Sequence, residues 1–518
     1  MSYERRRTRV HVVPDQAGEV PRIRPAGTAG AYAPAVAETH SGLVFFVGDR
    51  AFKLKKAVNL GFLDFTARER RREACEREVV LNRRLAPDVY LGVVDMLGPS
   101  GEVCDHLVVM RRLPADRRLS TLVRDGAPVE TILDELARLI ADFHARAARS
   151  PAADRAAGAD ALAARWAANT AGLRPFGGRY VDAADVEAVD VLAARYLAGR
   201  GPLFEQRIAA GRARDGHGDL LADDIFCLSD GPRVLDCLEF DDALRLDDTL
   251  ADAAFLAMDL ERLGRPDLAE RFLAAYRTAA SDAWPASLAH HHVAYRAQVR
   301  TKVTALRADQ GVPGAAEKAR QLLEMTRAHL DAARVRLVLV GGLPGTGKST
   351  LAVGLADTLG AVIIRSDVVR KELAGLPVSQ PAPAPYGEGI YAPDWSAATY
   401  RELLRRAHHA LTHGETVVLD ASWSDETRRA DARRVAAETV SDLIELCCVA
   451  PADVTAARLA ARAEAGGDAS DADRDIADAM TAAEHPWPAS IAIDTVPEPR
   501  AVLDAALNHI ATADNSPG

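Results

Sequence analysis

The 518-residue sequence lacks any uninterrupted apolar run near the ~18 to 20 residues that a membrane-spanning helix needs. It also lacks an N-terminal secretory signal with an apolar core. Its six cysteines include no CxxC pair and no zinc-ligand spacing. We therefore expect a cytoplasmic protein that does not span a membrane and keeps its thiols reduced.

A surplus of basic residues is missing as well. Lys and Arg number 64 against 74 Asp and Glu, for a formal net charge of −10. General nucleic-acid binders usually carry a clustered basic surplus, so the composition argues against nucleic acid as a partner. With 48% apolar and 27% charged residues, the chain has the composition of a globular protein. Nothing in it indicates an oligomeric state.

What the sequence does contain is a glycine-rich motif of the form GxxxxGK[ST], directly after the apolar stretch Val338-Leu339-Val340. Such a loop between a buried strand and a helix turns backbone N–H groups toward phosphates. We expect Lys348 to reach the β- and γ-phosphates and Ser349 to ligate Mg²⁺. The motif thus predicts binding of a nucleoside triphosphate, through Gly342, Pro344, Gly345, Thr346, Gly347, Lys348, Ser349 and Thr350.

Two further apolar runs, 361–364 and 416–419, predict strands of the same parallel sheet. Ligands bind at the carboxyl ends of such strands, so Asp367 and Arg370 are candidates for contact with the acceptor substrate. Asp420 ends the second run and is a candidate for ordering Mg²⁺ or its water. The alternative for Asp420 is a cap on the next helix.

Arg458 and Arg462 lie four residues apart and hence on one face of a predicted helix. On a mobile lid they would neutralise charge that develops on a transferred phosphoryl group. The alternative is an ordinary surface helix. Together with the segments GLPGTGKST, SDVVRK and VVLDAS, this pair resembles the small-molecule P-loop kinases, including the gluconate-type, chloramphenicol-type and zeta-toxin-like phosphotransferases. The resemblance implies that Asp367 orients the acceptor hydroxyl.

The N-terminal half begins with two apolar runs around the turn signal Gly48-Asp49, within residues 42–56. A helical pattern follows over 70–85, then a strand pattern at 107–110, and an alanine-rich helical stretch from about 130. This grouping resembles the small and large lobes of the protein-kinase-like fold.

Two acidic stretches carry a more specific resemblance: HGDLLADDIF at 217–226 and VLDCLEFDD at 234–242 resemble the catalytic and metal-binding stretches of the aminoglycoside phosphotransferase family. By that resemblance Asp219 orients or deprotonates an acceptor hydroxyl. Asp224 stands where the family has a Mg²⁺-binding Asn, and Glu239 where it has a second metal-binding carboxylate. Both departures keep the hard oxygen ligand that Mg²⁺ requires. Asp236 and Asp241 are rival ligands.

The same resemblance implies a nucleotide-clamping lysine on a small-lobe strand and a glutamate on the helix after it. We choose Lys53 and Glu78, with Lys55 on the same strand face as Lys53. Glu73 and Glu76 remain alternatives to Glu78. No GxGxxG loop is present in this region, so residues 38–42 would have to cover the phosphates.

Four histidines invite a metal or catalytic role. His217 is expected to hold the catalytic loop by packing and hydrogen bonding. The run His290-His291-His292 has no carboxylate or cysteine at ligand spacing and is expected on a helix surface.

The whole arrangement resembles bacterial two-domain proteins in which an aminoglycoside-phosphotransferase-like domain precedes a P-loop kinase-like domain. We predict a mobile tail over 1–36, a protein-kinase-like domain of mixed α+β class over 37–330, with lobes at about 37–113 and 114–330, and a P-loop domain of α/β class over 335–512. The resemblance implies an ATP- and Mg²⁺-dependent phosphotransferase that acts on a hydroxyl of a sugar, an aminosugar or an aminoglycoside-like compound.

Two other functions stay open. The first is a regulatory nucleotide-binding protein in which one kinase-like domain is inactive and gates the other. The second is a toxin-like or nucleic-acid-end kinase, which would need a basic groove that the acidic composition does not favour.

Overall fold

The computed structural model describes residues 10–12, 23–25, 35–38, 42–59, 64–380, 382, 385, 387–465, 474–482 and 485–514. The chain divides into two compact units, one of residues 1–157 and 210–283 and the other of residues 158–209 and 284–518. The second unit thus includes parts of the predicted kinase-like domain. The domain boundaries near residues 36 and 330 stay predictions.

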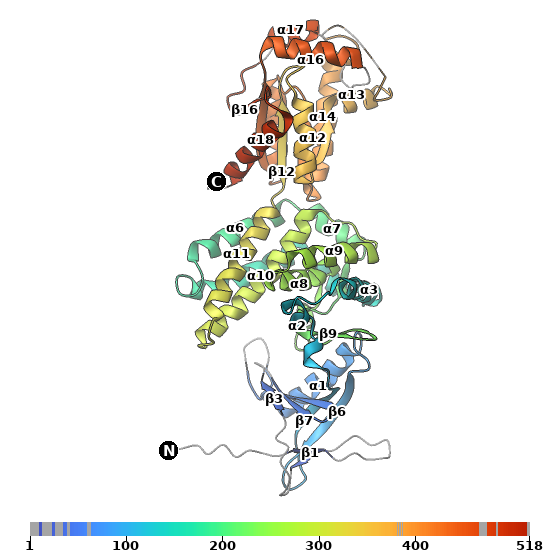
Figure 1. The fold of residues 1–518 in the computed structure, drawn as a ribbon, viewed down its shortest axis with the longest axis vertical. Helices are drawn as coiled ribbons and strands as arrows, with labels where there is room; N and C mark the ends of the chain where they lie inside the picture. The colour runs from blue at the N-terminus through green and yellow to red at the C-terminus, as the bar shows by residue number, and fades with distance from the viewer. Residues whose placement is uncertain are drawn as a thin grey trace. The chain divides into compact units, whose positions relative to one another are not determined.

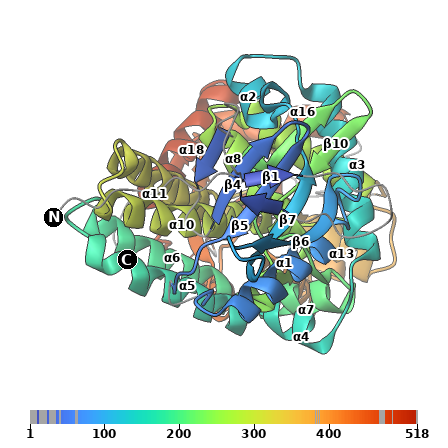
Figure 2. The same ribbon diagram turned by 90° about the horizontal axis from the view of Figure 1, so that it is seen from below.

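The first unit opens with a seven-stranded sheet in the order β1-β2-β6-β7-β5-β4-β3. The predicted hairpin is confirmed as β4 and β5, whose turn places Gly48 at a left-handed φ of 57°. The predicted helix is α1, which lies along β6 and β7 (Figure 2). The bounds are β1 Val10–Val12, β2 Ile23–Pro25, β3 Ala35–Glu38, β4 Gly42–Val47, β5 Arg50–Lys55, α1 Arg68–Asn82, β6 Tyr90–Leu97 and β7 Val103–Arg111.

Helices and two short hairpins form the rest of this unit. Helix α8 is buried from Thr249 to Leu260, as expected for a helix that is apolar nearly all round. Two strand pairs, β9 with β10 and β8 with β11, frame the acidic stretches. The elements are α2 Leu119–Arg124, α3 Glu130–Arg146, α4 Pro151–Ala156, β8 Ala213–Asp215, η3 Ala222–Asp224, β9 Ile225–Leu228, β10 Gly231–Val234, β11 Leu246–Asp248, α8 Thr249–Arg262 and α9 Pro266–Ala279.

The second unit contains five helices from outside the P-loop region. Helices α10 and α11 pack against each other after the predicted turn, where Gly311 and Gly314 adopt left-handed conformations. The expected surface position of the histidine run is wrong for two members, since His291 and His292 are 0% and 1% exposed. The bounds are α5 Ala159–Leu173, α6 Ala183–Ala198, α7 Gly201–Ala209, α10 Ala286–Asp309 and α11 Ala315–Ala332.

The P-loop region is a parallel five-stranded sheet in the order β13-β14-β12-β15-β16, with helices around it (Figure 1). Val338 and Val340 of β12 pack with α12 and α18 in one core. By strand alternation Leu337 and Leu339 point to the opposite face, and both are fully buried. The strands are β12 Arg336–Gly341, β13 Val362–Arg365, β14 Val417–Asp420, β15 Asp442–Val449 and β16 Ile491–Asp494.

The helices of this region follow the strands in alternation, as in a βαβ fold. They are α12 Lys348–Leu359, α13 Ser366–Leu373, α14 Pro393–Thr412, α15 Glu426–Glu438, α16 Ala452–Ala465, α17 Arg474–Ala482 and α18 Pro499–Asp514. The mostly antiparallel sheet with helices and the parallel α/β sheet together confirm the predicted fold class.

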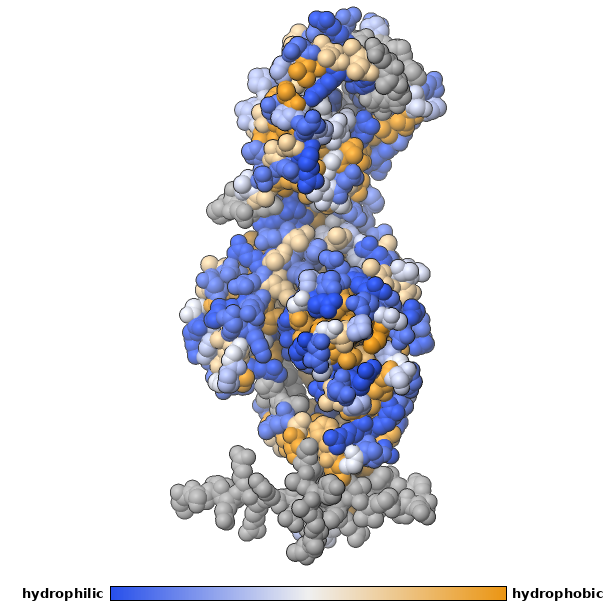
Figure 3. All heavy atoms as spheres, viewed as in Figure 1, coloured by the Kyte–Doolittle hydropathy of each residue, from blue (hydrophilic) through white to orange (hydrophobic). Residues whose placement is uncertain are grey.

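Hydrophilic residues cover most of the face shown in Figure 3. Across the described residues, no helix combines the length and the apolar composition that a bilayer crossing needs. Of the segment predicted as a mobile tail, the structure describes β1, β2 and the first two residues of β3, which join the sheet. The mobility of the tail stays a prediction.

Candidate active sites

The P-loop connects the carboxyl end of β12 to the first turn of α12. Gly342 and Gly345 adopt φ values of 132° and 82°, which other residues rarely reach. A Cβ at Gly345 would also lie 2.8 Å from the backbone oxygen of Thr455. The loop therefore requires glycine both for its conformation and for the close approach of α16. Helix α12 begins at Lys348, so its positive end faces the space in front of the loop.

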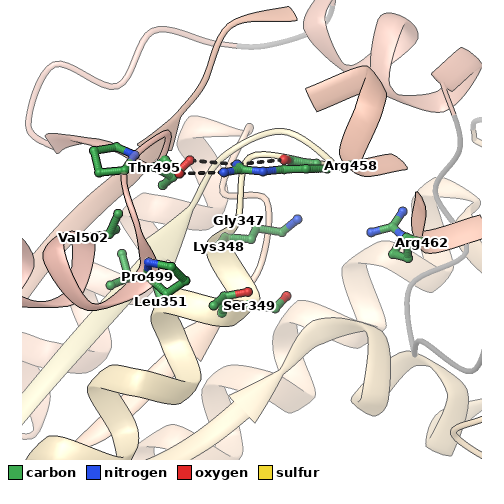
Figure 4. Close-up of a pocket in the computed structure, with 12 residues that line it drawn as sticks. Gly347, Lys348, Ser349, Leu351, Arg458, Arg462, Thr495, Pro499 and Val502 are labelled. Atoms are coloured by element: carbon green, nitrogen blue, oxygen red, sulfur yellow. Dashed lines mark hydrogen bonds between the residues drawn. The ribbon is translucent and has the colours of Figure 1, made fainter. Parts of the chain in front are cut away.

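A cavity of about 360 Å³ opens in front of this loop. Figure 4 shows the Lys348 amine and the Arg462 guanidinium directed into the same space. The far wall comes from the segment that follows β16, a part of the chain in which the sequence shows no recognisable motif. The lining residues are Gly345, Gly347, Lys348, Ser349, Thr350, Leu351, Arg458, Arg462, Thr495, Pro497, Pro499 and Val502.

The two arginines of α16 differ in their surroundings. Arg458 donates from Nη2 to the backbone oxygen of Thr495 at 2.6 Å and from Nη1 to the Thr495 hydroxyl at 3.2 Å (Figure 4). Arg462 lines the cavity one turn later. The predicted lid segment after α16, residues 466–471, lies outside the described residues. Arg458 thus holds the wall of the cavity, while the Arg462 guanidinium is directed into the cavity.

Asp420 ends β14 beside the P-loop strand, where it pairs with Val340 in the sheet register. Its side chain is nearly buried, and its Oδ2 accepts a hydrogen bond of 3.2 Å from Arg365 Nε. Its Oδ1 is buried and has no hydrogen-bond partner among the described residues. A buried carboxylate oxygen without a donor fits Mg²⁺ or a water bound to it.

The alternative role for Asp420, capping the next helix, is wrong. Helix α15 is capped by Asp425, whose Oδ1 accepts a hydrogen bond of 2.9 Å from the Thr427 backbone N–H. Ser349, the other predicted Mg²⁺ ligand of this domain, lines the nucleotide cavity in the first turn of α12. The residues present therefore fit a magnesium ion held between a bound triphosphate, Ser349 and Asp420.

A second cavity, of about 370 Å³, adjoins the other side of Lys348. Asp367 and Arg370 line it from the same face of α13, three residues apart. Its other walls come from three segments: one with Tyr391 and Tyr400; one with Ser422, Ser424, Asp425 and Arg428; and one with Ile476 and Met480. Since both cavities include Lys348, a phosphate held there would touch a molecule in either one.

In the first unit, the predicted lysine and glutamate meet in a buried ion pair. Lys53 Nζ lies 2.9 Å from Glu78 Oε1 and 2.5 Å from Asp236 Oδ1. Lys55 Nζ lies 2.5 Å from Glu78 Oε2 and also pairs with Glu239. Burial acts to lower the pKa of Lys53, but the charges of Asp236, Glu78 and Glu239 raise it well above its ordinary value. Lys53 is therefore a permanent cation in this site.

The predicted metal ligands Asp224 and Glu239 lie in different surroundings. Glu239 pairs with Lys55, whereas Asp224 lies near the negative charges of Asp236 and Asp219. Enclosure raises the pKa of Asp224 well above its ordinary range, and the negative charges of Asp236 and Asp219 raise it further. A cation bound here would relieve that repulsion. The rival ligand Asp236, at a left-handed φ of 64°, pairs with Lys53, whereas Glu239 pairs with Lys55.

A buried carboxylate holds the loop that carries Asp219. Asp252 on α8 accepts hydrogen bonds from the backbone N–H groups of His217, at 2.7 Å, and Gly218, at 2.8 Å. His144 Nε2 lies 3.0 Å from the same carboxylate. His217 itself is fully buried, and burial lowers its pKa. The structure thus places His217 in a scaffold position, as expected.

In the described part of the chain, no group of three or more His, Cys, Asp or Glu side chains is arranged to hold a metal ion. Mg²⁺ in phosphoryl-transfer sites is held by one or two protein oxygens together with substrate phosphates and water. The residues therefore fit an ion that enters with the nucleotide. Of residues 38–42, predicted to cover the phosphates, 39–41 lie outside the described residues.

Comparison with known proteins extends these observations. A family model described as an AAA domain matches residues 337–486. Uncharacterized proteins of Mycobacterium tuberculosis and Mycobacterium bovis are each 46% identical to this chain over 471 residues, which is 91% of this chain and 94% of theirs.

Solved structures were also found to be similar to parts of this chain. A sugar kinase from Janibacter sp. is 21% identical, covers 35% of this chain and 99% of its own, and gives a TM-score of 0.27. A choline/ethanolamine kinase family protein from Mesorhizobium loti is 16% identical, covers 58% of this chain and 93% of its own, and gives a TM-score of 0.36.

Proposed function

The chain belongs to the same family as these uncharacterized mycobacterial proteins, and we propose that it is an ATP- and Mg²⁺-dependent phosphotransferase with two nucleotide-binding domains. Its acceptor is a hydroxyl of a small molecule such as a sugar, an aminosugar or an aminoglycoside-like compound. One observation carries the proposal: two cavities, of about 360 and 370 Å³, share Lys348 at the start of α12. Both volumes fall within the range of about 300–1,000 Å³ of small-molecule sites.

In the P-loop domain, the triphosphate occupies the first cavity and the acceptor the second. The acceptor oxygen forms a bond to the γ-phosphorus while the bond from that phosphorus to the β–γ bridging oxygen breaks, and ADP leaves. The hydroxyl proton passes to Asp367, which lines the acceptor cavity. Lys348 and Arg462 stabilise the charge on the transferred group. Ser349 and Asp420 would hold Mg²⁺, which would neutralise phosphate charge there.

In the N-terminal domain, Lys53 with its partner Glu78 clamps a second nucleotide, and Asp219 orients a second acceptor. The buried ion pair of Lys53 and Glu78 supports nucleotide binding there. The negative charges of Asp236 and Asp219 near Asp224 support Mg²⁺ binding. They also support a second candidate function, in which this domain binds nucleotide and regulates the other without turnover. The observation that favours it is the direct contact of Asp236 with Lys53, because a carboxylate competes with phosphate for that lysine.

The test is ATP consumption with Mg²⁺ against a pooled panel of sugars, aminosugars, aminoglycosides and nucleosides. Wild type is compared with Lys348→Ala, Asp219→Asn and the control Arg406→Gln, whose side chain pairs with Glu372 and Glu402 outside both cavities. Acceptor-dependent turnover that is lost only in Lys348→Ala assigns the chemistry to the P-loop domain. Loss only in Asp219→Asn assigns it to the other domain, and loss in both indicates coupled sites. Tight ATP binding without any acceptor-stimulated turnover overturns the phosphotransferase proposal in favour of the regulatory one.

A further inference from the structure

The acceptor cavity of the P-loop domain contains a buried cation with an unused hydrogen-bond donor. Arg370 is 7% exposed and lines the cavity from α13. Its Nη1 donates to the Ile390 backbone oxygen at 2.9 Å and to the Ser396 hydroxyl at 3.1 Å. Its Nε is buried and has no partner among the described residues. A buried N–H of a charged group that finds no acceptor in its own protein is a strong indication of an acceptor in the ligand.

The guanidinium is held in one orientation. Its carbon lies 4.7 Å from the centre of the Tyr391 ring, which packs against the planar group. The two hydrogen bonds from Nη1 fix the remaining rotation. Since Nη1 makes both of these bonds, the edge that carries Nε is the edge left for a ligand. An arginine edge fixed in this way matches the two oxygens of a carboxylate or phosphate.

The other charges in the cavity do not neutralise Arg370. The cavity is lined by Lys348, Arg370 and Arg428 on the positive side and by Asp367 and Asp425 on the negative side. No described carboxylate lies within ion-pair distance of Arg370. Asp425 caps α15 and lies 3.9 Å from Arg428. With Lys348 assigned to the nucleotide and Asp367 to the acceptor hydroxyl, the surplus in the rest of the cavity is positive.

We propose, building on the function above, that the acceptor of the P-loop domain is a small hydroxylated anion whose carboxylate or phosphate group binds the Nε edge of Arg370. Asp367 and Arg370 lie three residues apart on one helix face, so both reach the same small molecule. The proton of its hydroxyl goes to Asp367 and its anionic group lies against Arg370. This narrows the acceptor from any polyol or aminosugar to one that carries negative charge, and it disfavours cationic aminoglycosides in this cavity.

The test uses the full-length protein, MgATP and matched acceptors that differ in charge: glucose, gluconate and glucose 6-phosphate, and glycerol, glycerate and glycerol 3-phosphate. ADP release and the mass of the phosphorylated product are measured for each. We expect the anionic members to give a kcat/KM at least about 10-fold above that of the neutral member. A preference for gluconate and glycerate identifies a carboxylate, and a preference for the phosphorylated compounds identifies a phosphate.

The variant Arg370→Met isolates the interaction. Loss of hydrogen bonds to a charged group predicts a decrease of about 10- to 150-fold in kcat/KM for the anionic acceptor, with little change for its neutral counterpart. Arg370→Lys keeps the charge but loses the planar edge, so we expect a partial decrease. Arg406→Gln on α14 is the matched control, and MgATP affinity with thermal unfolding verifies that each variant keeps its fold and its nucleotide site.

Two results would overturn the inference, and they are distinguishable. If neutral acceptors are phosphorylated at least as well as anionic ones, and Arg370→Met reduces both alike, the anionic acceptor is wrong while the phosphotransferase stands. If none of these compounds raises ATP consumption although MgATP binds through Lys348, the proposed function of this domain fails together with the inference.

Discussion

Arg458 of α16 donates a hydrogen bond of 2.6 Å to the backbone oxygen of Thr495, the residue that follows β16. The Thr495 hydroxyl in turn donates at 2.6 Å to the backbone oxygen of Thr346 within the P-loop. The conformation of the phosphate-binding loop therefore depends on two residues that lie more than a hundred positions after it. Neither belongs to the motif by which such loops are recognised.

Replacement of Arg458 is expected to weaken nucleotide binding more than it destabilises the fold. Arg458→Met removes charged hydrogen bonds to Thr495, and Thr495 would then be less well held against the P-loop. We therefore expect MgATP affinity to decrease by about 10- to 100-fold. Isothermal titration calorimetry measures the affinity and thermal unfolding measures the stability. Arg434→Gln, at an exposed ion pair on α15, is the control. Unchanged MgATP affinity in Arg458→Met would show that the contact between Arg458 and Thr495 does not stabilise the P-loop conformation.

Asp236 and Glu239 are expected to differ in their effect on the kinase-like site. In a Lys348→Ala background, which removes the P-loop site, Asp236→Asn should abolish Mg²⁺-dependent nucleotide binding, since Asp236 faces Asp224 and Lys53. Glu239→Gln should retain binding but lower the melting temperature, because it leaves Lys55 with one carboxylate partner instead of two. Equilibrium binding of a fluorescent ATP analogue, with and without Mg²⁺, measures nucleotide binding in both variants. The reverse pattern would assign the metal to Glu239, as the family resemblance implied.

Loss of the Asp252 carboxylate is expected to disorder the loop that carries Asp219. The charges and hydrogen bonds of His144 and His217 overcome the effect of burial and hold the pKa of Asp252 below its ordinary value, so it is ionised in the folded protein. In Asp252→Asn the two backbone N–H groups of residues 217 and 218 lose a charged acceptor. We expect destabilisation of about 3–5 kcal/mol, as for a broken buried charge pair. Denaturant unfolding measures it, and Asp267→Asn, at an exposed pair on α9, should leave stability nearly unchanged.

Stability of the second unit is expected to fall in mild acid because of His291. Its ring stacks on Tyr196 at 4.4 Å between centroids, and neither ring nitrogen has a partner among the described residues. Burial, reinforced by the neighbouring His292, lowers the pKa of His291 well below 6.5. The unfolded chain therefore binds a proton that the folded chain does not, and stability declines by about 1.4 kcal/mol per pH unit as the pH falls below 6.5.

The variant His291→Phe should flatten this part of the pH profile, since phenylalanine keeps the stacking and cannot bind a proton. Urea unfolding at a series of pH values between 7.5 and 5 is the measurement, with the exposed His408→Gln as the control. A profile for His291→Phe that parallels the wild type would mean that other groups cause the decline.

Local patterns predicted the parts of the fold that depend on neighbours in sequence. The hairpin of β4 and β5, helix α1, the turn at Gly311 and the strands on either side of the P-loop follow from apolar periodicity and glycine placement. The face of β5 that meets Glu78 was also predictable, because strand alternation puts Lys53 and Lys55 on one side, and both pair with Glu78.

The rest depends on contacts that no spacing in the sequence encodes. Asp236 reaches Lys53 because its backbone adopts a left-handed conformation, which the residue type alone does not indicate. His291 and His292 are buried because other helices of the unit cover their face of α10, and a single helix does not predict its partners. Thr495 lines the first cavity, and Tyr391 and Arg428 line the second; these residues come from segments far apart in the sequence, so only the folded chain brings them to Lys348.

The segment after β16, which forms the far wall of the nucleotide cavity, has a consequence for the design of truncated proteins. A fragment designed on the matched family region would stop at residue 486 and would contain every signature residue from Gly342 to Asp420. It would omit β16, Thr495 and the start of α18, and with them four of the twelve residues that line the cavity and the contact that supports the loop. Such a fragment would carry the complete motif and yet be expected to fail in nucleotide binding, so that failure would reveal nothing about nucleotide binding by the intact protein.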